Sequence, residues 1–373
     1  MSSSGTRIGV MGCGAISSIY LENLTGRISK KGETQCEVVS CADLDRTAAE
    51  RLASRYGVPE ICSPEELIAH SEIDLILNRT TPGAHWPVAR DAIRAGKHVY
   101  NEKPLAVRLA DGHAILDEAR HHNVRVGAAP DTVLGAGLQT ARNVIDAGDI
   151  GQPVAGTAFM TCRGHESWHP NPAFYYDVGG GPLFDMGPYY LTALVHLLGP
   201  AVRVTGSART SFETRTITSE PRRGETIEVK VPTHAAAVID FACGAVITLI
   251  MSFDVHRARL PIIEIYGSEG SLAVPDPNTF GGAVERFNPK SKSWEACAMI
   301  GGLPTENRRG LGVHDMVSAI RADRPHLASG EIALHVLEIM HAVHRSSNVG
   351  VHVEIHSQPE RPAAMKPVPS AWL

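Results

Sequence analysis

The first third of the chain alternates short apolar runs with longer amphipathic stretches, and this alternation restricts the possible folds more than any other feature. The apolar runs, which we expect to be strands, lie at residues 7–11, 37–42, 73–77, 97–100 and 124–128. The amphipathic stretches, which we expect to be helices, lie at residues 15–24, 47–56, 86–95 and 107–122. This order predicts an α/β fold with a doubly wound parallel sheet in a first domain over residues 1–130.

The remainder of the chain has a different pattern. After one expected helix at 138–147, runs such as VAGTAFMTC, HAAAVIDFA and AVITLIMSF follow one another with turn residues between them. Consecutive strands joined by turns are typical of antiparallel sheets. We therefore expect residues 131–373 to form a second, α+β domain with a large open, mostly antiparallel sheet and a last helix near residues 333–346.

Composition narrows the class of partner. The formal net charge of -5 gives no basic surface for a phosphate backbone, so we do not expect nucleic-acid binding. No stretch approaches about 18 uninterrupted apolar residues, so no membrane partner is expected, and the lack of an apolar segment after Met1 favours a cytoplasmic location. The seven cysteines form no C-x-x-C pair and are expected to be free thiols. A small molecule is the expected ligand.

A glycine loop, GVMGCGAIS, lies between the first expected strand and the first expected helix. Gly12 permits a tight turn, and Gly14 lets the backbone approach a pyrophosphate at the N-terminus of the helix. Ala15 and Ile16 complete this candidate dinucleotide-binding loop. Ser17 stands where the G-x-G-x-x-G pattern has its third glycine, and glycines also serve ordinary turns, so the loop alone is weak evidence.

An acidic residue follows the second expected strand. Asp43 stands where a carboxylate can accept hydrogen bonds from both hydroxyls of an adenosine ribose, and the same charge would repel a 2′-phosphate. The cofactor expected is therefore NAD rather than NADP. Asp43 lies farther from the glycines than usual, and the polar insert at residues 25–35 accounts for the excess as a surface loop. The alternative is that Asp43 only ends a strand.

The stretch His165-Glu166-Ser-Trp-His169 matches the H-E-x-x-H pattern of zinc peptidases, in which a helix presents both histidines to one ion. Pro170 disfavours helical geometry at His169, and the residues before the motif are typical of a strand. We therefore expect the motif in a strand-to-loop connection, with no metal site. Its polar groups and the flat ring of Trp168 suit a sugar, so we assign His165, Trp168 and His169 to substrate; the alternative is that Trp168 packs under the loop.

Three further motifs follow in order along the chain. They are Thr81-Pro82-Gly-Ala-His85, Glu102-Lys103-Pro104 after a Gly-Lys-His-Val strand, and Gly179-Gly-Gly-Pro-Leu-Phe-Asp185-Met-Gly187-Pro-Tyr189. Together with the glycine loop they resemble the glucose–fructose oxidoreductase, inositol dehydrogenase and MocA (Gfo/Idh/MocA) family over nearly the whole chain. The E-K-P tripeptide is the most specific of them.

The resemblance implies a Rossmann domain followed by an open sheet, with nicotinamide between them and sugars, polyols or related alcohols as substrates. It places Thr81, Pro82, His85, Glu102 and Lys103 beside the cofactor. It also implies a homodimer or homotetramer, because the second domain's sheet would have an apolar face that another subunit can cover. In the family, the lysine of E-K-P lies beside the reacting carbinol, and a cation there can polarise an alcohol oxygen.

The last motif departs from the commonest family pattern, D-x-G-x-H-x-x-D. Tyr189 stands at the histidine position and Thr192 at the second aspartate, as in a tyrosine-variant branch that includes glucose–fructose oxidoreductase and dihydrodiol dehydrogenase. We expect Tyr189 to be the acid/base, Lys103 to polarise the hydroxyl and favour the phenolate, and Asp185 to position the hydroxyl or the lysine. The alternative is that Tyr189 and Tyr190 are core aromatics at the start of a helix, a role that suits Tyr190 better.

The function expected is thus NAD-dependent oxidation of a carbinol in a sugar, glycoside or cyclic polyol. One alternative within the enzymes is an NADP-linked glucose–fructose oxidoreductase or a dihydrodiol dehydrogenase-like protein. Another, of a different class, is a non-catalytic regulatory protein that binds a sugar or a nucleotide. The intact Lys103, Asp185 and Tyr189 disfavour the regulatory alternative.

Overall fold

The structure, a computed structural model, describes residues 5–25 and 36–368. The chain divides into two compact units. The first takes in the described residues of Met1–Ala136, Gly301–Leu334 and Met365–Leu373, and the second takes in Gly137–Ile300 and His335–Ala364.

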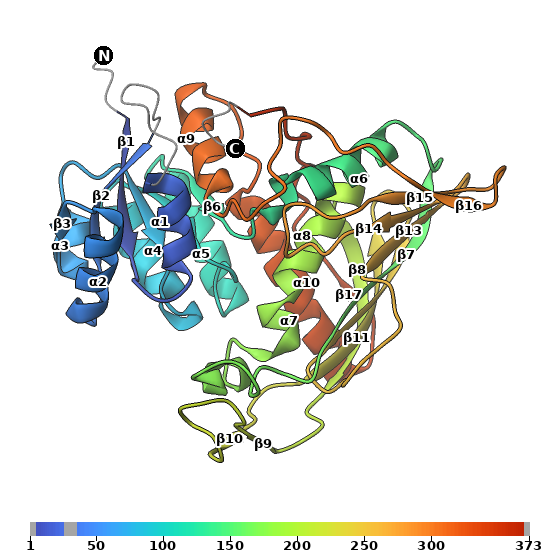
Figure 1. Ribbon diagram of the computed structural model, residues 1–373, viewed down its shortest axis with the longest axis horizontal. Coiled ribbons are helices and arrows are strands. Elements are labelled where there is room, and N and C mark those ends of the chain that lie inside the picture. The colour runs from blue at the N-terminus through green and yellow to red at the C-terminus, as the bar shows by residue number, and fades with distance from the viewer. Residues whose placement is uncertain (1–4, 26–35, 369–373) are drawn as a thin grey trace. The chain divides into compact units, whose positions relative to one another are not determined.

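The first unit is built on a six-stranded sheet of order β3-β2-β1-β4-β5-β6, in which every neighbouring pair is parallel (Figure 1). Its strands are β1 (Thr6–Met11), β2 (Cys36–Ala42), β3 (Glu60–Ile61), β4 (Leu75–Asn78), β5 (His98–Asn101) and β6 (Val126–Ala128). Its helices are α1 (Ser17–Thr25), α2 (Arg46–Tyr56), α3 (Pro64–Ala69), α4 (His85–Arg94), α5 (Leu109–His121) and α9 (Leu311–Arg321), with short 3₁₀ turns η1 (Pro82–Ala84) and η2 (Thr132–Leu134).

The apolar runs become central strands because they are covered on both faces. Ile8 and Val10 on β1 and Leu75, Ile76 and Leu77 on β4 are all fully buried. The strand order changes direction between β1 and β4. Doubly wound sheets bind ligands at the carboxyl ends of the strands at such a point, so a cofactor site is expected at this edge of the sheet.

The second unit contains a nine-stranded sheet of order β16-β15-β14-β13-β7-β12-β11-β8-β17. Its strands are β7 (Pro153–Thr161), β8 (Ala201–Arg209), β11 (His234–Phe241), β12 (Val246–Ser252), β13 (Ile263–Gly267), β14 (Ser271–Val274), β15 (Glu285–Asn288), β16 (Ser293–Ala296) and β17 (Val353–Glu354). Only β7 and β12 pair in parallel; the other neighbours are antiparallel.

Helices cover one face of this sheet (Figure 1). They are α6 (Ala136–Asp146), α7 (Gly181–Asp185), α8 (Gly187–Leu198) and α10 (Gly330–Val349), and η3 (Pro172–Tyr176) precedes α7. The close approach of α10 explains a glycine in β8: a Cβ on Gly206 would lie 2.6 Å from the carbonyl oxygen of Val343. A separate two-stranded ribbon, β9 (Thr214–Thr216) with β10 (Thr226–Glu228), extends from the unit.

The predicted fold class is confirmed: a Rossmann-type parallel sheet precedes a mostly antiparallel sheet with helices. Every strand and helix expected in the first third is present, whereas α3, β3 and α9 were not predicted. The expected surface loop at 25–35 lies, beyond Thr25, outside the described residues. All seven cysteines are free thiols, as predicted. Within residues 5–25 and 36–368, no helix combines the length and hydropathy needed to cross a bilayer.

Candidate active site

The glycine loop turns between β1 and α1 as the sequence predicts. Gly12 has φ +94°, and a Cβ there would lie 2.7 Å from the backbone carbon of Arg79, so only glycine fits. Ser17, at the position of the third glycine, is fully buried, and its hydroxyl donates to the carbonyl oxygen of Gly12 at 2.7 Å. The Ser17 hydroxyl therefore stabilises the turn at Gly12 from a position where a third glycine would allow close packing of the helix against the strand.

The glycine loop has open space and unused backbone hydrogen-bond donors that suit an anion. A Cβ on Gly14 would meet no atom within 4 Å. Within the described part of the chain, the backbone N–H groups of Gly14, Ala15 and Ile16 donate to no protein acceptor. These three free donors precede the first turn of α1, a helix of nine residues whose positive end favours negative charge. The residues present thus fit the pyrophosphate of a dinucleotide.

Asp43 lies directly after β2, where the sequence places it, and it also holds the glycine loop. Its Oδ2 accepts a hydrogen bond from the backbone N–H of Cys13 at 2.6 Å, and its Oδ1 accepts one from the N–H of Asp45 at 2.9 Å. A carboxylate has about four acceptor positions, so two remain for ribose hydroxyls. The residue is partly exposed.

The ends of β4 and β5 carry a buried ion pair that the sequence analysis missed. An Nη atom of Arg79 lies 2.6 Å from Oε1 of Glu102, and the Arg79 guanidinium lies 3.5 Å from the centre of the Tyr20 ring. Tyr20 also donates to Glu102 at 3.2 Å. Burial raises the pKa of the Glu102 carboxyl, but the charges of Arg79 and Lys103 outweigh it and hold this pKa below its ordinary value.

Glu102 uses its second oxygen to hold the next residue. The backbone N–H of Lys103 donates to Oε2 of Glu102 at 3.0 Å. The carboxylate therefore fixes the start of the Glu102-Lys103-Pro104 turn while Arg79 fixes the carboxylate. The Lys103 residue itself is half-buried at the carboxyl end of the parallel sheet.

His85 lies behind this turn rather than at the surface. It is fully buried, with Nδ1 2.7 Å from the carbonyl oxygen of Pro104 and Nε2 3.1 Å from that of Thr80. Burial lowers the pKa of its imidazole. His85 thus ties the segment after β4 to the turn after β5. Thr81 is exposed and Pro82 partly so, and both lie in the same segment.

In the second unit, Asp185 is the last residue of α7 and Tyr189 lies in the first turn of α8. Tyr189 and Tyr190 are both buried, with exposed fractions of 7% and 4%. Burial raises the pKa of the Tyr190 phenol. Thr192, at the position of the family's second aspartate, is also buried.

The structure brings Asp185 together with the first histidine of the H-E-x-x-H stretch. The Nε2 atom of His165 lies 3.2 Å from Oδ2 of Asp185, and the two side chains are only 12% and 14% exposed. Both residues were predicted to belong to the site, but no pattern in the sequence predicts that they are in contact.

Glu166, the acidic residue of that stretch, is occupied by a structural contact. An Nη of Arg215 on β9 lies 2.9 Å from Oε1 of Glu166, and the hydroxyl of Tyr176 donates to Oε2. Arg215 also pairs with Asp254, and its side chain is only 3% exposed. Glu166 therefore anchors the loop to the β9–β10 ribbon.

The predicted loop conformation of the motif is confirmed. β7 ends at Thr161 and the next element is η3, with only isolated turns between them. Trp168 is 60% exposed, so it does not pack under the loop. His169 is half-buried, and its Nδ1 accepts from the N–H of Asn171 at 3.0 Å. Among the described residues, no three His, Cys, Asp or Glu side chains are placed to hold one metal ion.

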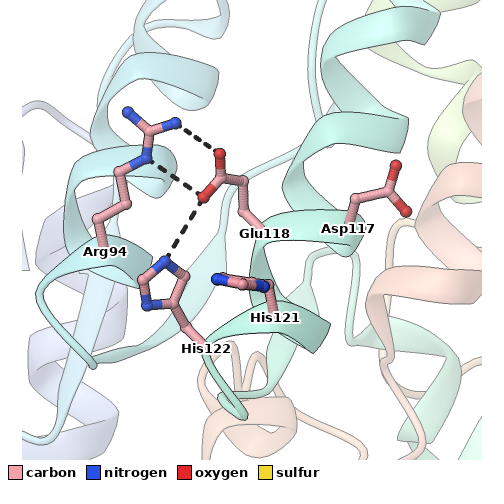
Figure 2. Close-up of a pocket in the computed structure, with 5 residues that line it drawn as sticks. All are labelled: Arg94, Asp117, Glu118, His121 and His122. Atoms are coloured by element: carbon pink, nitrogen blue, oxygen red, sulfur yellow. Dashed lines mark hydrogen bonds and ion pairs between the residues drawn. The ribbon is translucent and has the colours of Figure 1, made fainter.

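A surface hollow elsewhere in the first unit is unrelated to these residues. It is lined by Arg94, Asp117, Glu118, His121 and His122, and Figure 2 shows Arg94 and His122 both directed at Glu118. These residues lie at the carboxyl ends of α4 and α5. Those helix ends lie at the edge of the parallel sheet opposite the one that carries the glycine loop. None of the candidate site residues lines it.

Two family profiles match the chain. One, described as an oxidoreductase family with an NAD-binding Rossmann fold, matches residues 6–129, and the other, the GFO/IDH/MocA C-terminal domain, matches residues 138–273. Among curated proteins, a dTDP-3,4-didehydro-2,6-dideoxy-alpha-D-glucose 3-reductase of Streptomyces violaceoruber is 29% identical over 72% of this chain and 72% of its own. An inositol 2-dehydrogenase of Ralstonia nicotianae is 27% identical over 73% of this chain and 74% of its own.

Solved structures share the fold. A levoglucosan dehydrogenase in complex with NADH superposes with a TM-score of 0.82 at 19% identity, over 95% of this chain and 100% of that chain. An NAD-binding oxidoreductase from Klebsiella pneumoniae gives a TM-score of 0.80 at 23% identity, with the same coverage.

Proposed function

Because the chain belongs to the GFO/IDH/MocA family of oxidoreductases, we propose that it is an NAD-dependent dehydrogenase that oxidises a carbinol in a sugar, glycoside or cyclic polyol. The observation that carries this proposal is the cradle at Gly12 to Ile16, with its open space and three free N–H donors. The named activities of the relatives, a sugar-nucleotide reductase and inositol dehydrogenases, support the substrate class.

NAD is the proposed cofactor, since Asp43 presents a carboxylate at the end of β2 and a 2′-phosphate would be repelled there. Bound NAD supplies the acceptor for the hydride that leaves the carbinol carbon. The free N–H groups of Gly14, Ala15 and Ile16 would hold its pyrophosphate. Thr81 and Pro82 follow the Arg79–Thr80 backbone that approaches Gly12, and they would also line the cofactor.

The proton of the substrate hydroxyl is assigned to Tyr189, with Lys103 polarising the hydroxyl oxygen. Asp185 positions the hydroxyl or the lysine ammonium. Glu102 and Arg79 support this arrangement because they fix the turn that carries Lys103. The tyrosine at position 189 supports the proposal that the chain belongs to the tyrosine-variant branch of the family.

The loop after β7 is the proposed substrate surface. The indole of Trp168 is largely exposed and offers a flat face for the C–H side of a sugar ring. His165 and His169 are the polar groups that flank it. Glu166 contributes indirectly, because its pairing with Arg215 fixes the loop.

The test is a panel of sugars, glycosides and cyclic polyols, with reduction of NAD or NADP followed by absorbance. We expect at least one substrate to reduce NAD with wild-type protein and to lose most of its turnover with Lys103→Met. Preference for NADP, or purification with nucleotide already bound, would favour the NADP-linked glucose–fructose oxidoreductase or dihydrodiol dehydrogenase alternative. Nucleotide or sugar binding with no turnover over the whole panel would favour a regulatory protein.

The proposal extends to assembly and location. Val154, Val238 and Val246 are 50%, 44% and 42% exposed on strands of the nine-stranded sheet, which suits burial against a second copy in a homodimer or homotetramer. Size-exclusion chromatography with light scattering measures the mass of the assembly directly, and the mass of a monomer would contradict the proposed homodimer or homotetramer. A cytoplasmic location stays a prediction.

A further inference from the structure

We propose that His165 is a positioning residue for Asp185: its imidazole holds the Asp185 carboxylate in the orientation in which that carboxylate meets the substrate hydroxyl or the lysine ammonium. The inference rests on the proposed oxidoreductase function and deepens it. His165 then does not serve mainly as a substrate contact; its role is to position the Asp185 carboxylate.

The contact joins two elements that are distant in sequence. His165 lies in the loop after β7, and Asp185 is the last residue of α7. Nε2 of the imidazole lies 3.2 Å from Oδ2 of the carboxylate, and both side chains are more than four-fifths buried. A hydrogen bond to a carboxylate at this depth is less screened by water than one at the surface, so it can hold the carboxylate in one direction.

The imidazole has little freedom to turn away. Its ring centre lies 4.2 Å from that of Tyr175, 4.6 Å from that of Phe253 and 5.2 Å from that of Trp168, in each case edge to face. A ring packed on several sides, with one nitrogen at a carboxylate, is suited to fixing that carboxylate. It is poorly suited to exchanging hydrogen bonds among the hydroxyls of different sugars.

The backbone beneath His165 is also fixed. The neighbouring Glu166 carboxylate is held by Arg215 and Tyr176, and the Glu166 carbonyl oxygen accepts from the backbone N–H groups of Thr218 and Ser219. The buried ion pair therefore anchors the loop from which the imidazole reaches Asp185. In the H-E-x-x-H stretch, Glu166 thus fixes the loop through buried contacts, and His165 contacts Asp185 from that loop.

His169 is the matched control. It belongs to the same loop and the same aromatic cluster, with ring centres 5.3 Å from both Trp168 and Tyr175. Its Nδ1 accepts from the N–H of Asn171 instead of facing a carboxylate. Removing its imidazole disturbs the loop in a similar way but leaves the His165–Asp185 contact in place.

The experiment is a double-mutant cycle in kcat/KM with the substrate found in the panel. His165→Phe keeps a ring but has no donor, and we expect it to reduce kcat/KM by about tenfold or more, mainly through kcat, with NAD affinity unchanged. In an Asp185→Asn background the same change should cost less than about twofold. His165→Gln, which can still donate to Asp185, should recover most of the loss. His169→Gln should act equally in both backgrounds.

Equal losses from His165→Phe with and without Asp185 would overturn the proposal, as would a His165→Gln variant as impaired as His165→Phe. A second readout does not depend on turnover: in protein labelled with ¹⁵N-histidine, Asp185→Asn should shift the imidazole signals of His165 more than those of His169. If wild-type protein oxidises nothing in the panel, the proposed function fails, and this measurement decides the His165–Asp185 contact alone. Unshifted His165 signals would overturn the proposal in that case.

Discussion

Arg79 and Glu102 form an ion pair of 2.6 Å in which the arginine side chain is fully buried and the glutamate is 11% exposed. The two residues follow β4 and β5, adjacent parallel strands, so the sheet itself sets their separation. Glu102 in turn holds the backbone N–H of Lys103. The Arg79–Glu102 pair therefore fixes the backbone position from which the side chain of the candidate catalytic Lys103 extends.

Removing that arginine should be costly. Arg79→Met would leave the Glu102 carboxylate buried without its main counter-charge, and we expect a loss of about 3–5 kcal/mol in the free energy of unfolding at pH 7. Adding Glu102→Gln to the variant should restore part of the loss. Urea unfolding followed by circular dichroism measures both. Wild-type stability in Arg79→Met would show that the pair is not needed.

The same pair predicts a pH dependence. The folded-state pKa of Glu102 lies below its ordinary value, so the stability it contributes is present above that ordinary value and is lost as pH falls through the folded value. In Arg79→Met, burial would be less opposed and the pKa of Glu102 would rise. The difference in stability between wild type and variant should therefore shrink on acidification from pH 7 to pH 5. A constant difference over this range would contradict the assignment.

Gly14→Ala tests the cradle without straining the fold. Its Cβ would meet no protein atom within 4 Å but would occupy the space proposed for the pyrophosphate. We expect unchanged unfolding and a rise of about tenfold or more in the Kd for NAD, measured by calorimetry. Gly301→Ala is the control, since its Cβ also meets nothing within 4 Å but lies outside the loop. Equal affinities in the two variants would argue against the site.

Asp43 should set the choice between the two dinucleotides. Asp43→Ser removes the carboxylate that accepts from the Cys13 N–H and would repel a 2′-phosphate. We expect weaker NAD binding and stronger NADP binding, with the ratio of their Kd values changing by about tenfold or more. If the wild-type preference survives the substitution, Asp43 does not select the cofactor.

Trp168→Ala tests the proposed substrate face. Loss of an exposed indole that stacks on a sugar should raise KM by about five- to thirtyfold and leave kcat nearly unchanged. Trp294→Ala is matched to it, because Trp294 is 43% exposed on β16, at the far edge of the nine-stranded sheet. An unchanged KM in Trp168→Ala would remove the indole from the site.

The fold of the first unit could be predicted because its central strands, such as β1 and β4, are buried on both faces and read as continuous apolar runs. β3 and α3 are too short, at two and six residues, to produce a clear periodic pattern in the sequence. Gly12, Asp43 and Glu102 could be placed because each follows a strand that the periodicity reveals. Arg79 also follows a strand, and its position beside the Thr81 motif was the available signal. No sequence signal predicted the role of Arg215, because its partner Glu166 is 49 residues away.

The central claim is that Tyr189 and Lys103 act on one substrate hydroxyl, and turnover in Tyr189→Phe tests it most directly. We expect kcat to fall by about two orders of magnitude or more while the Kd for NAD stays at its wild-type value. Tyr190→Phe, the same change at the neighbouring buried tyrosine, should retain most of the turnover. Near wild-type kcat in Tyr189→Phe, or equal losses in the two variants, would contradict the account.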